Sequence, residues 1–183
     1  MRLRQAAFLA LVVVAAGCGK TTANGDSTRC APLADGTAAK SSAAKPTQTM
    51  LLTDVKAGSE PCADRVAFTF EPADQKLGYR VEYLPAEQAQ TEDGSGKHLD
   101  IPGKAFLVVR LEPAATADIS SENLRVTYKG PRTITPAGLK YVQQITKIGD
   151  FEAVLAWTIG LSEKRPFKVT SAGSPPHLTI EIG

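Results

Sequence analysis

Apolar side chains recur at every second position through most of residues 50–183, and this spacing is typical of β-strands with one buried face. The stretch "RVAFTFEP" places Val66, Phe68 and Phe70 on one side of the chain, and "YRVEYLP" and "HLTIEIG" alternate in the same way. "KAFLVVRLEP" is apolar almost throughout from Ala105 to Val109, as a strand buried on both faces would be. The pattern therefore predicts strands rather than helices.

Segments rich in proline and glycine separate these strands, among them "EPADQKLG", "EDGSGKHLDIPGK", "KGPRTITPAG" and "SAGSPP". Many short strands with such breaks predict an all-β fold, an antiparallel sandwich or barrel, and residues 50–183 have the length of one domain. The segment "AGLKYVQQITKIGDFEA" is ambiguous, since Leu139, Val142 and Ile145 also permit a helical turn. We expect a strand from Val142 onward.

The first 17 residues have the parts of a bacterial signal peptide. Arg2 and Arg4 form a short positive region, and the apolar segment 6–17 has about 12 residues, whereas a membrane span needs about 20. Three small residues then precede Cys18 directly. This arrangement resembles the bacterial lipobox, although Ala15 stands where Leu or Val is more usual. We therefore predict a lipoprotein signal peptide over residues 1–17.

The lipobox resemblance implies that Cys18 becomes the mature N-terminus. It would carry a thioether-linked diacylglycerol and an amide-linked acyl chain such as palmitate. Each buried CH₂ contributes about 0.8 kcal/mol, so two or three chains hold a protein on a membrane durably. The expected location is the extracytoplasmic face of the cell membrane, with the membrane as partner through Cys18. The alternative is an ordinary secretory signal followed by a chance cysteine.

The "GKT" that follows Cys18 does not predict a nucleotide site. A P-loop needs a glycine with four residues between it and Gly-Lys-Thr, and that position is Val14. Charge argues against nucleic acid as well: 21 Lys+Arg face 19 Asp+Glu, and removing Arg2 and Arg4 leaves 19 against 19. Nucleic-acid binding needs a clustered excess of cations. We expect no nucleotide, no nucleic acid and no cofactor.

Residues 18–49 are rich in Gly, Ser, Thr, Ala, Asp and Lys, and nearly lack periodic apolar residues, so we expect a lipidated, flexible tether there. Once Cys18 is acylated, Cys30 and Cys62 are the remaining thiols, and an exported chain is in an oxidising compartment. We predict a Cys30–Cys62 disulfide. It would fasten part of the tail to the domain and leave residues 19–29 as a linker with an r.m.s. reach of about 20 Å.

Neither metal binding nor catalysis is expected. His98 and His177 have no neighbours at metal-ligand spacing, and the chain has no "GxSxG" nucleophile elbow. Asp150 and Glu152 would share one face if "GDFEA" were a strand, and a paired-carboxylate glycosidase site would then be conceivable. The alternative is a strand edge or turn with two solvated charges. We predict no catalytic and no metal-binding residues.

Several phrases in order resemble the AMIN-like domain of exported actinobacterial proteins. They are "LLTDVKAGSEPCADRVAFTFE", "LGYRVEYL" and "GDFEAVLAWTIGLSEKRPFKVTSAGSPPHLTIEI", and they cover nearly all of residues 51–182. The resemblance departs from the wider AMIN pattern at His177, where Arg is usual, and at Cys62, where Gly is more frequent. It implies a β-sandwich over residues 50–183. It also implies a localisation module that attaches to peptidoglycan or to envelope partners.

A binding face needs aromatic and hydrogen-bonding side chains, and "GYRVEY" supplies Tyr79, Arg80, Glu82 and Tyr83, with Asp64 and Arg65 on the preceding strand. Sugar rings stack on aromatic faces, and Arg can hold a carboxylate in a bidentate fork. These six residues are the candidate ligand-binding set. The alternative is that Tyr79 and Tyr83 are core residues beside Val81, and that Arg65 pairs with an acidic neighbour. Trp157, inside an apolar run, is expected in the core.

The function expected from these observations is non-catalytic. A membrane-anchored lipoprotein would use its β-sandwich domain to bind peptidoglycan or another envelope component. Two alternatives remain open: a structural or protein-interaction lipoprotein with no glycan ligand, and a wall-active hydrolase built on Asp150 and Glu152.

Overall fold

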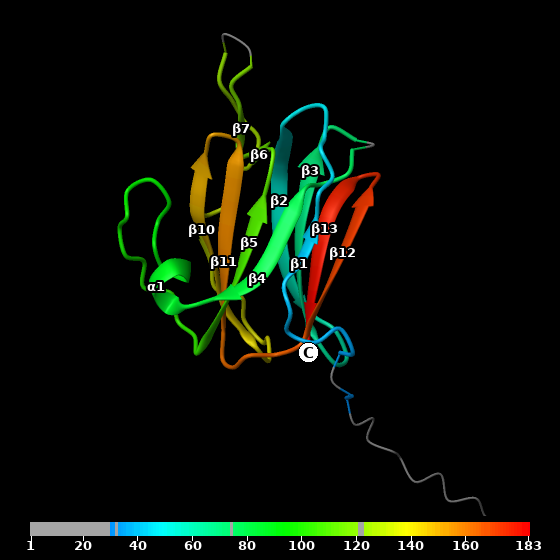
Figure 1. Ribbon diagram of the computed structural model, residues 1–183, viewed down its shortest axis with the longest axis vertical. Coiled ribbons are helices and arrows are strands. Elements are labelled where there is room, and N and C mark those ends of the chain that lie inside the picture. The colour runs from blue at the N-terminus through cyan, green and yellow to red at the C-terminus, as the bar shows by residue number, and fades with distance from the viewer. Residues whose placement is uncertain (1–29, 32, 74, 121–122) are drawn as a thin grey trace, which may run out of the picture.

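The computed structural model describes residues 30–31, 33–73, 75–120 and 123–183. The predicted signal peptide, Cys18 and the linker up to residue 29 lie outside the described residues. The predicted all-β sandwich is confirmed (Figure 1). Its elements are β1 (Lys40–Ser42), β2 (Met50–Ser59), β3 (Asp64–Glu71), β4 (Tyr79–Leu84), α1 (Ala86–Ala89), β5 (Ala105–Leu111), β6 (Ala114–Ala115), β7 (Ala117–Asp118), β8 (Arg125–Val126), β9 (Thr133–Ile134), β10 (Val142–Phe151), β11 (Val154–Leu161), β12 (Phe167–Gly173) and β13 (Pro176–Ile182).

Two sheets pack face to face. One has the strand order β1-β4-β5-β11-β10-β9 and the other β12-β13-β3-β2-β6, and β7 and β8 form a separate hairpin. The described strand pairs are antiparallel, except that β2 and β6 run parallel. No helix among the described residues is long and apolar enough to cross a membrane.

The core between the sheets follows the alternation seen in the sequence. Val66, Phe68 and Phe70 point inward from β3 and are at most 3% exposed. Trp157 is fully buried, as expected, and packs edge to face against Phe68 and Tyr128 with ring centroids 5.8 and 5.6 Å apart. Such geometry adds to the stabilisation that area burial provides.

The central strands of the β4–β5–β11–β10 sheet are buried on both faces. On the outer face, Phe106 and Val108 of β5 pack with Ile148 and Ala156 under the loop that contains α1. Ile101 of that loop completes the cluster. The second layer explains why "AFLVV" is apolar throughout, so the prediction of a doubly buried strand is confirmed.

Asp64 is a buried charge that links the two sheets. Its side chain is 1% exposed, and its carboxylate accepts hydrogen bonds from the backbone N–H groups of Lys140, Tyr141 and Val142 at 3.0, 2.6 and 2.8 Å. A buried carboxylate is tolerated when several donors satisfy it. These bonds hold the chain extended at the start of β10, so the expected strand from Val142 onward is confirmed.

The structure departs from the predicted flexible tether over residues 18–49 at residues 36–42, which are bonded to the sandwich. β1 pairs with β4, the backbone N–H of Phe167 donates to the carbonyl of Gly36 at 3.0 Å, and the ammonium of Lys40 lies 4.0 Å from the Phe167 ring centroid. The segment thus bridges the side of the sandwich where the edge strands β4 and β12 would be exposed. The amino-acid composition did not indicate this ordered segment, because a segment held mainly by backbone hydrogen bonds needs few apolar side chains.

The predicted disulfide is present and joins Cys30 to Cys62, with Cα atoms 5.2 Å apart. Cys62 lies in the β2–β3 turn, so the chain enters the domain at the end that also holds the C-terminus (Figure 1). We call this the disulfide end. We call the opposite end the distal end; it holds Met50 and the β10–β11 turn. β2 begins there at Met50 and ends at the disulfide end at Ser59. The ten residues of β2 separate the two ends by about 30 Å.

Removing the disulfide should lower the free energy of unfolding by about 3–4 kcal/mol, because the bond closes a loop of 32 residues in the unfolded chain. The measurement is urea denaturation of the Cys30→Ser/Cys62→Ser double variant. A reducing agent should produce the same loss in the wild type and no further loss in the variant. An unchanged denaturation midpoint would contradict a stabilising disulfide.

Candidate functional site

The six residues predicted to bind a ligand do not form one surface. β3, with Asp64 and Arg65, and β4, with the other four residues, belong to different sheets. Asp64 is buried and bonded to the backbone as described above, so its proposed contact with a ligand is not available. Arg65 points outward and pairs with Glu60 at 3.5 Å, which is the acidic-neighbour alternative.

The two tyrosines of "GYRVEY" lie on the core side of β4. The hydroxyl of Tyr83 donates to the Arg165 carbonyl at 2.7 Å and accepts from the Arg165 N–H at 3.1 Å, and its ring contacts Phe167 edge to face. Burial raises the pKa of the Tyr83 phenol. Tyr79 packs against the core and borders a small hollow of about 550 Å³ beside β12. Tyr83 is therefore a core residue, as in the alternative interpretation of the sequence. Tyr79 is half-buried and lines the hollow beside β12.

Arg80 and Glu82 point to the outer face of β4 and satisfy each other. The Nε and Nη2 atoms of Arg80 donate to the two carboxylate oxygens of Glu82 at 2.5 and 2.6 Å. The hydrogen bonds from Arg80 lower the pKa of the Glu82 carboxyl. A ligand carboxylate would have to displace Glu82 to reach the guanidinium, so this pair is a poor anion site.

Asp150 and Glu152 do not form a carboxylate pair on one strand face. Phe151 pairs with Val154, which leaves Glu152 and Ala153 as a two-residue hairpin loop. The Asp150 carboxylate accepts a short hydrogen bond from the Thr116 hydroxyl and lies 3.1 Å from the Lys147 ammonium. The turn alternative is therefore correct for Glu152, whereas Asp150 is bonded rather than solvated. Among the described residues, no group of three or more His, Cys, Asp or Glu side chains could hold a metal ion.

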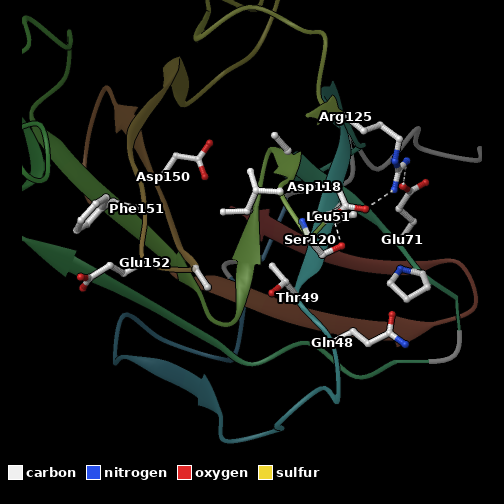
Figure 2. A pocket seen from close by; sticks show the side chains of 15 residues that line it. Gln48, Thr49, Leu51, Glu71, Asp118, Ser120, Arg125, Asp150, Phe151 and Glu152 are labelled. Atoms are coloured by element: carbon white, nitrogen blue, oxygen red, sulfur yellow. Dashed lines mark hydrogen bonds and ion pairs between the residues drawn. The ribbon is translucent and has the colours of Figure 1, made fainter. Parts of the chain in front are cut away.

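A depression with a volume of about 1130 Å³ lies at the distal end. Backbone bonds fix its frame: the Met50 N–H donates to the Pro113 carbonyl at 2.9 Å and the Ala114 N–H to the Ala153 carbonyl at 2.7 Å. Its fifteen lining residues are Gln48, Thr49, Leu51, Glu71, Pro72, Ala115, Ala117, Asp118, Ile119, Ser120, Arg125, Asp150, Phe151, Glu152 and Ala153. Figure 2 shows Arg125, Glu71 and Asp118 on one side and Asp150, Phe151 and Glu152 on the other.

The distal end also carries the exposed apolar side chains. Within the described ranges, the exposed large apolar residues are Ile119, Leu124, Val126 and Phe151, with exposed fractions of 80%, 67%, 49% and 67%. Three belong to the β7–β8 hairpin and its flanks, and Phe151 ends β10 beside the same depression. Single exposed apolar residues are ordinary, whereas a cluster bordering a depression marks an interaction site.

Ion pairs engage three of the four carboxylates that line the depression, those of Glu71, Asp118 and Asp150. Arg125 bridges Glu71 at 2.6 Å and Asp118 at 3.4 Å. Hydrogen bonds from Ser120, and then the Arg125 guanidinium, lower the pKa of the Asp118 carboxyl. Glu152 has no hydrogen bond or ion pair within the described part of the chain, and its carboxylate is open to a ligand.

The turn that presents Phe151 has an unfavourable backbone. Glu152 and Ala153 have φ angles of 51° and 59°, and a non-glycine residue in this region costs roughly 1–2 kcal/mol. Asn-Gly is the sequence that suits such a hairpin loop. Unfavourable backbone geometry of this kind is often kept at functional sites.

The sequence did not predict this depression, and the candidate ligand-binding residues were placed on β4 and at the start of β3. The available signal was the apolar residues of "ADISSENLRV", which stand in a polar stretch without strand alternation. The contribution of Phe151 could not be found, because the sequence does not show that β10 ends there.

Tyr83→Ala should destabilise the domain by about 3 kcal/mol, since it leaves a cavity beside Phe167 and removes two hydrogen bonds to Arg165. Tyr83→Phe should cost about 1–2 kcal/mol, because it keeps the ring contact. Thermal unfolding measures both. An unchanged melting temperature for Tyr83→Ala would contradict the core position and return Tyr83 to the candidate ligand set.

Comparison with known proteins agrees with the resemblance noted in the sequence. No curated protein and no solved structure matches the chain. A model of the AMIN-like domain family matches residues 50–183, which includes β2 to β13 and both ends of the sandwich. Since the match covers well over half of the chain, the protein belongs to the AMIN-like domain family.

Proposed function

We propose that the protein is a lipid-anchored, extracytoplasmic module that binds a component of the cell envelope and catalyses no reaction. Membership of the AMIN-like domain family supports a role in envelope binding. The distal end offers a surface suited to such binding. The observation that carries the proposal is that Ile119 and Phe151, two of the four exposed large apolar residues of the described part of the chain, line one depression. The other two, Leu124 and Val126, belong to the same β7–β8 segment as Ile119.

The position of the tether supports this use of the distal end. In the proposal, Cys18 is acylated and residues 19–29 connect it to Cys30 at the disulfide end. The distal end lies about 30 Å further away, along the length of β2. A protein anchored in this way would turn its depression away from the membrane and toward the rest of the envelope.

Binding suits the distal end better than hydrolysis does. A retaining or inverting glycosidase needs two carboxyl groups free to act as acid and base or nucleophile. Thr116 and Lys147 hold Asp150, and Arg125 holds Glu71 and Asp118. Glu152 alone is open. The depression is wide enough for several side chains of a partner, and its apolar floor favours non-covalent contact.

The lipid anchor predicts that Cys18→Ala releases the protein from membranes, because the substitution removes the thiol that the diacylglyceryl group modifies. The measurement is the fraction that sediments with washed membranes, together with mass spectrometry of the N-terminal fragment. We expect nearly complete membrane retention and a lipid adduct in the wild type. Undiminished retention of Cys18→Ala, or an unmodified Cys18, would overturn lipid anchoring.

The binding surface predicts that Phe151→Ser combined with Ile119→Ser reduces retention by envelope fragments at least tenfold. Both side chains are largely exposed, so their removal should leave the melting temperature within about 2 °C. The measurement is cosedimentation of the full chain with envelope fragments that retain wall and proteins. Glu87→Lys, at an exposed helix position away from the depression, is the control and should bind like the wild type. Equal retention of the double variant and the wild type would overturn binding at the distal end.

A further inference from the structure

We propose that the distal end receives a polypeptide segment in which basic side chains flank an apolar anchor residue. This inference rests on the proposed function, because it takes the distal end as the envelope-binding surface. Three observations carry it: the chemistry of the exposed side chains, the balance of charge around the depression, and the placement of all tyrosines and the tryptophan.

The exposed side chains favour protein over glycan. Sugar rings bind on Tyr and Trp faces, whose polar atoms also hydrogen-bond hydroxyls. The chain has one Trp and four Tyr, and the structure describes all five: Trp157, Tyr128 and Tyr141 are buried, Tyr83 is bonded to Arg165, and Tyr79 borders the other hollow. The distal end instead offers Phe151 and the aliphatic side chains of Ile119, Leu124 and Val126. Aliphatic and Phe side chains suit the core of a protein interface.

The charge at the depression favours a basic partner. Four carboxylates line it, from Glu71, Asp118, Asp150 and Glu152, against the single guanidinium of Arg125. Lys147 lies against Asp150 and offsets one further charge. The formal net charge of these six side chains is therefore −2. Glu152 is the one whose carboxylate has no partner among the described residues. Opposite charge across an interface steers encounter and suppresses wrong partners.

The same balance argues against two other occupants. A second copy of this chain that binds through its own distal end would bring a like-charged surface and face repulsion. A wall polymer rich in carboxylates would meet the same repulsion, and it would find no exposed Tyr or Trp face within the part of the chain that the structure describes. A polypeptide with basic side chains beside an apolar residue complements both the acidic and the apolar side chains of the depression.

The arrangement of the surface suits one anchor side chain. Figure 2 shows Phe151 and Glu152 across the depression from the Arg125–Asp118 pair. An apolar side chain of the partner can enter between these two groups and lie against Leu51 and Ala115. A neighbouring Lys or Arg can then reach the Glu152 carboxylate without displacing an existing ion pair.

The test uses the full chain in its native host, with a photoreactive benzoylphenylalanine in place of Phe151. We expect irradiation to yield an adduct that protease destroys and that muralytic enzymes leave intact. Mass spectrometry of the adduct should place Lys or Arg within about four residues of the linked apolar residue. Glu152→Lys should reduce the adduct at least fivefold, and the same probe at Glu87 should yield none of it.

Each other result overturns the inference. A dimer of this chain would make the occupant a second copy, an adduct sensitive only to muralytic enzymes would make it a glycan, and a lipid adduct would make it a membrane. A polypeptide adduct that is insensitive to Glu152→Lys would remove the electrostatic basis, and the absence of any adduct would remove the partner.

A second measurement separates this inference from the proposed function. Envelope fragments are stripped of protein with protease, and binding of the full chain is compared before and after. Loss of at least nine tenths of the binding supports a polypeptide partner. Undiminished binding to stripped fragments overturns the polypeptide and leaves the envelope-binding proposal standing, whereas no binding to intact fragments overturns both.

Discussion

The hydrogen bonds of the Asp64 carboxylate to the backbone at residues 140–142 fix the geometry on which both sheets depend. Asp64 begins β3 in one sheet, and Val142 begins β10 in the other. Three backbone N–H groups donate to the buried Asp64 carboxylate, so the side chain and the three amides satisfy one another. Removing either side would leave buried polar groups unpaired, at a cost of several kcal/mol. This connection fixes the start of β10 against the first residue of β3.

The two ends of the sandwich differ in how much apolar side-chain surface they leave exposed. At the disulfide end, the guanidinium of Arg165 and the ammonium of Lys140 lie 4.6 and 5.0 Å from the centre of the Tyr141 ring. Cation–π contacts of this kind tie loops to the core. At the distal end, a turn with two positive φ angles presents Phe151 to solvent. Loop residues therefore pack against the core at the disulfide end, whereas apolar surface stays exposed at the distal end.

The sequence was sufficient for the fold and insufficient for the site. Period-two alternation identified most of the long strands, and the doubly buried β5 was recognisable because "AFLVV" has no polar break. The ordered segment around β1 was missed, because its contacts are mainly backbone bonds and leave little trace in composition. The β4 ligand set failed for a similar reason: alternation puts Tyr79 and Tyr83 on the same face as Val81, and only the packing of Phe167 decides that this face is the inner one.

The distal site depends on where a strand ends, which a local pattern does not specify. If β10 had continued through Glu152, Asp150 and Glu152 would have shared a face, but the register of Phe151 with Val154 places the loop one residue earlier. This register turns a conceivable pair of catalytic carboxylates into one bonded and one open carboxylate beside an exposed phenylalanine.

The apolar residues of the distal end contribute little to folding, and this sharpens the case for binding. Burying a large apolar side chain contributes about 1.5–3 kcal/mol, and most of that is forgone where two thirds of the side chain stays in water, as for Leu124 and Phe151. The turn adds an unfavourable backbone to the same place. Neither feature improves the isolated domain, whereas both position apolar surface beside an open carboxylate. Burial of these side chains against a partner would recover the forgone stabilisation, which is what the proposed binding at the distal end requires.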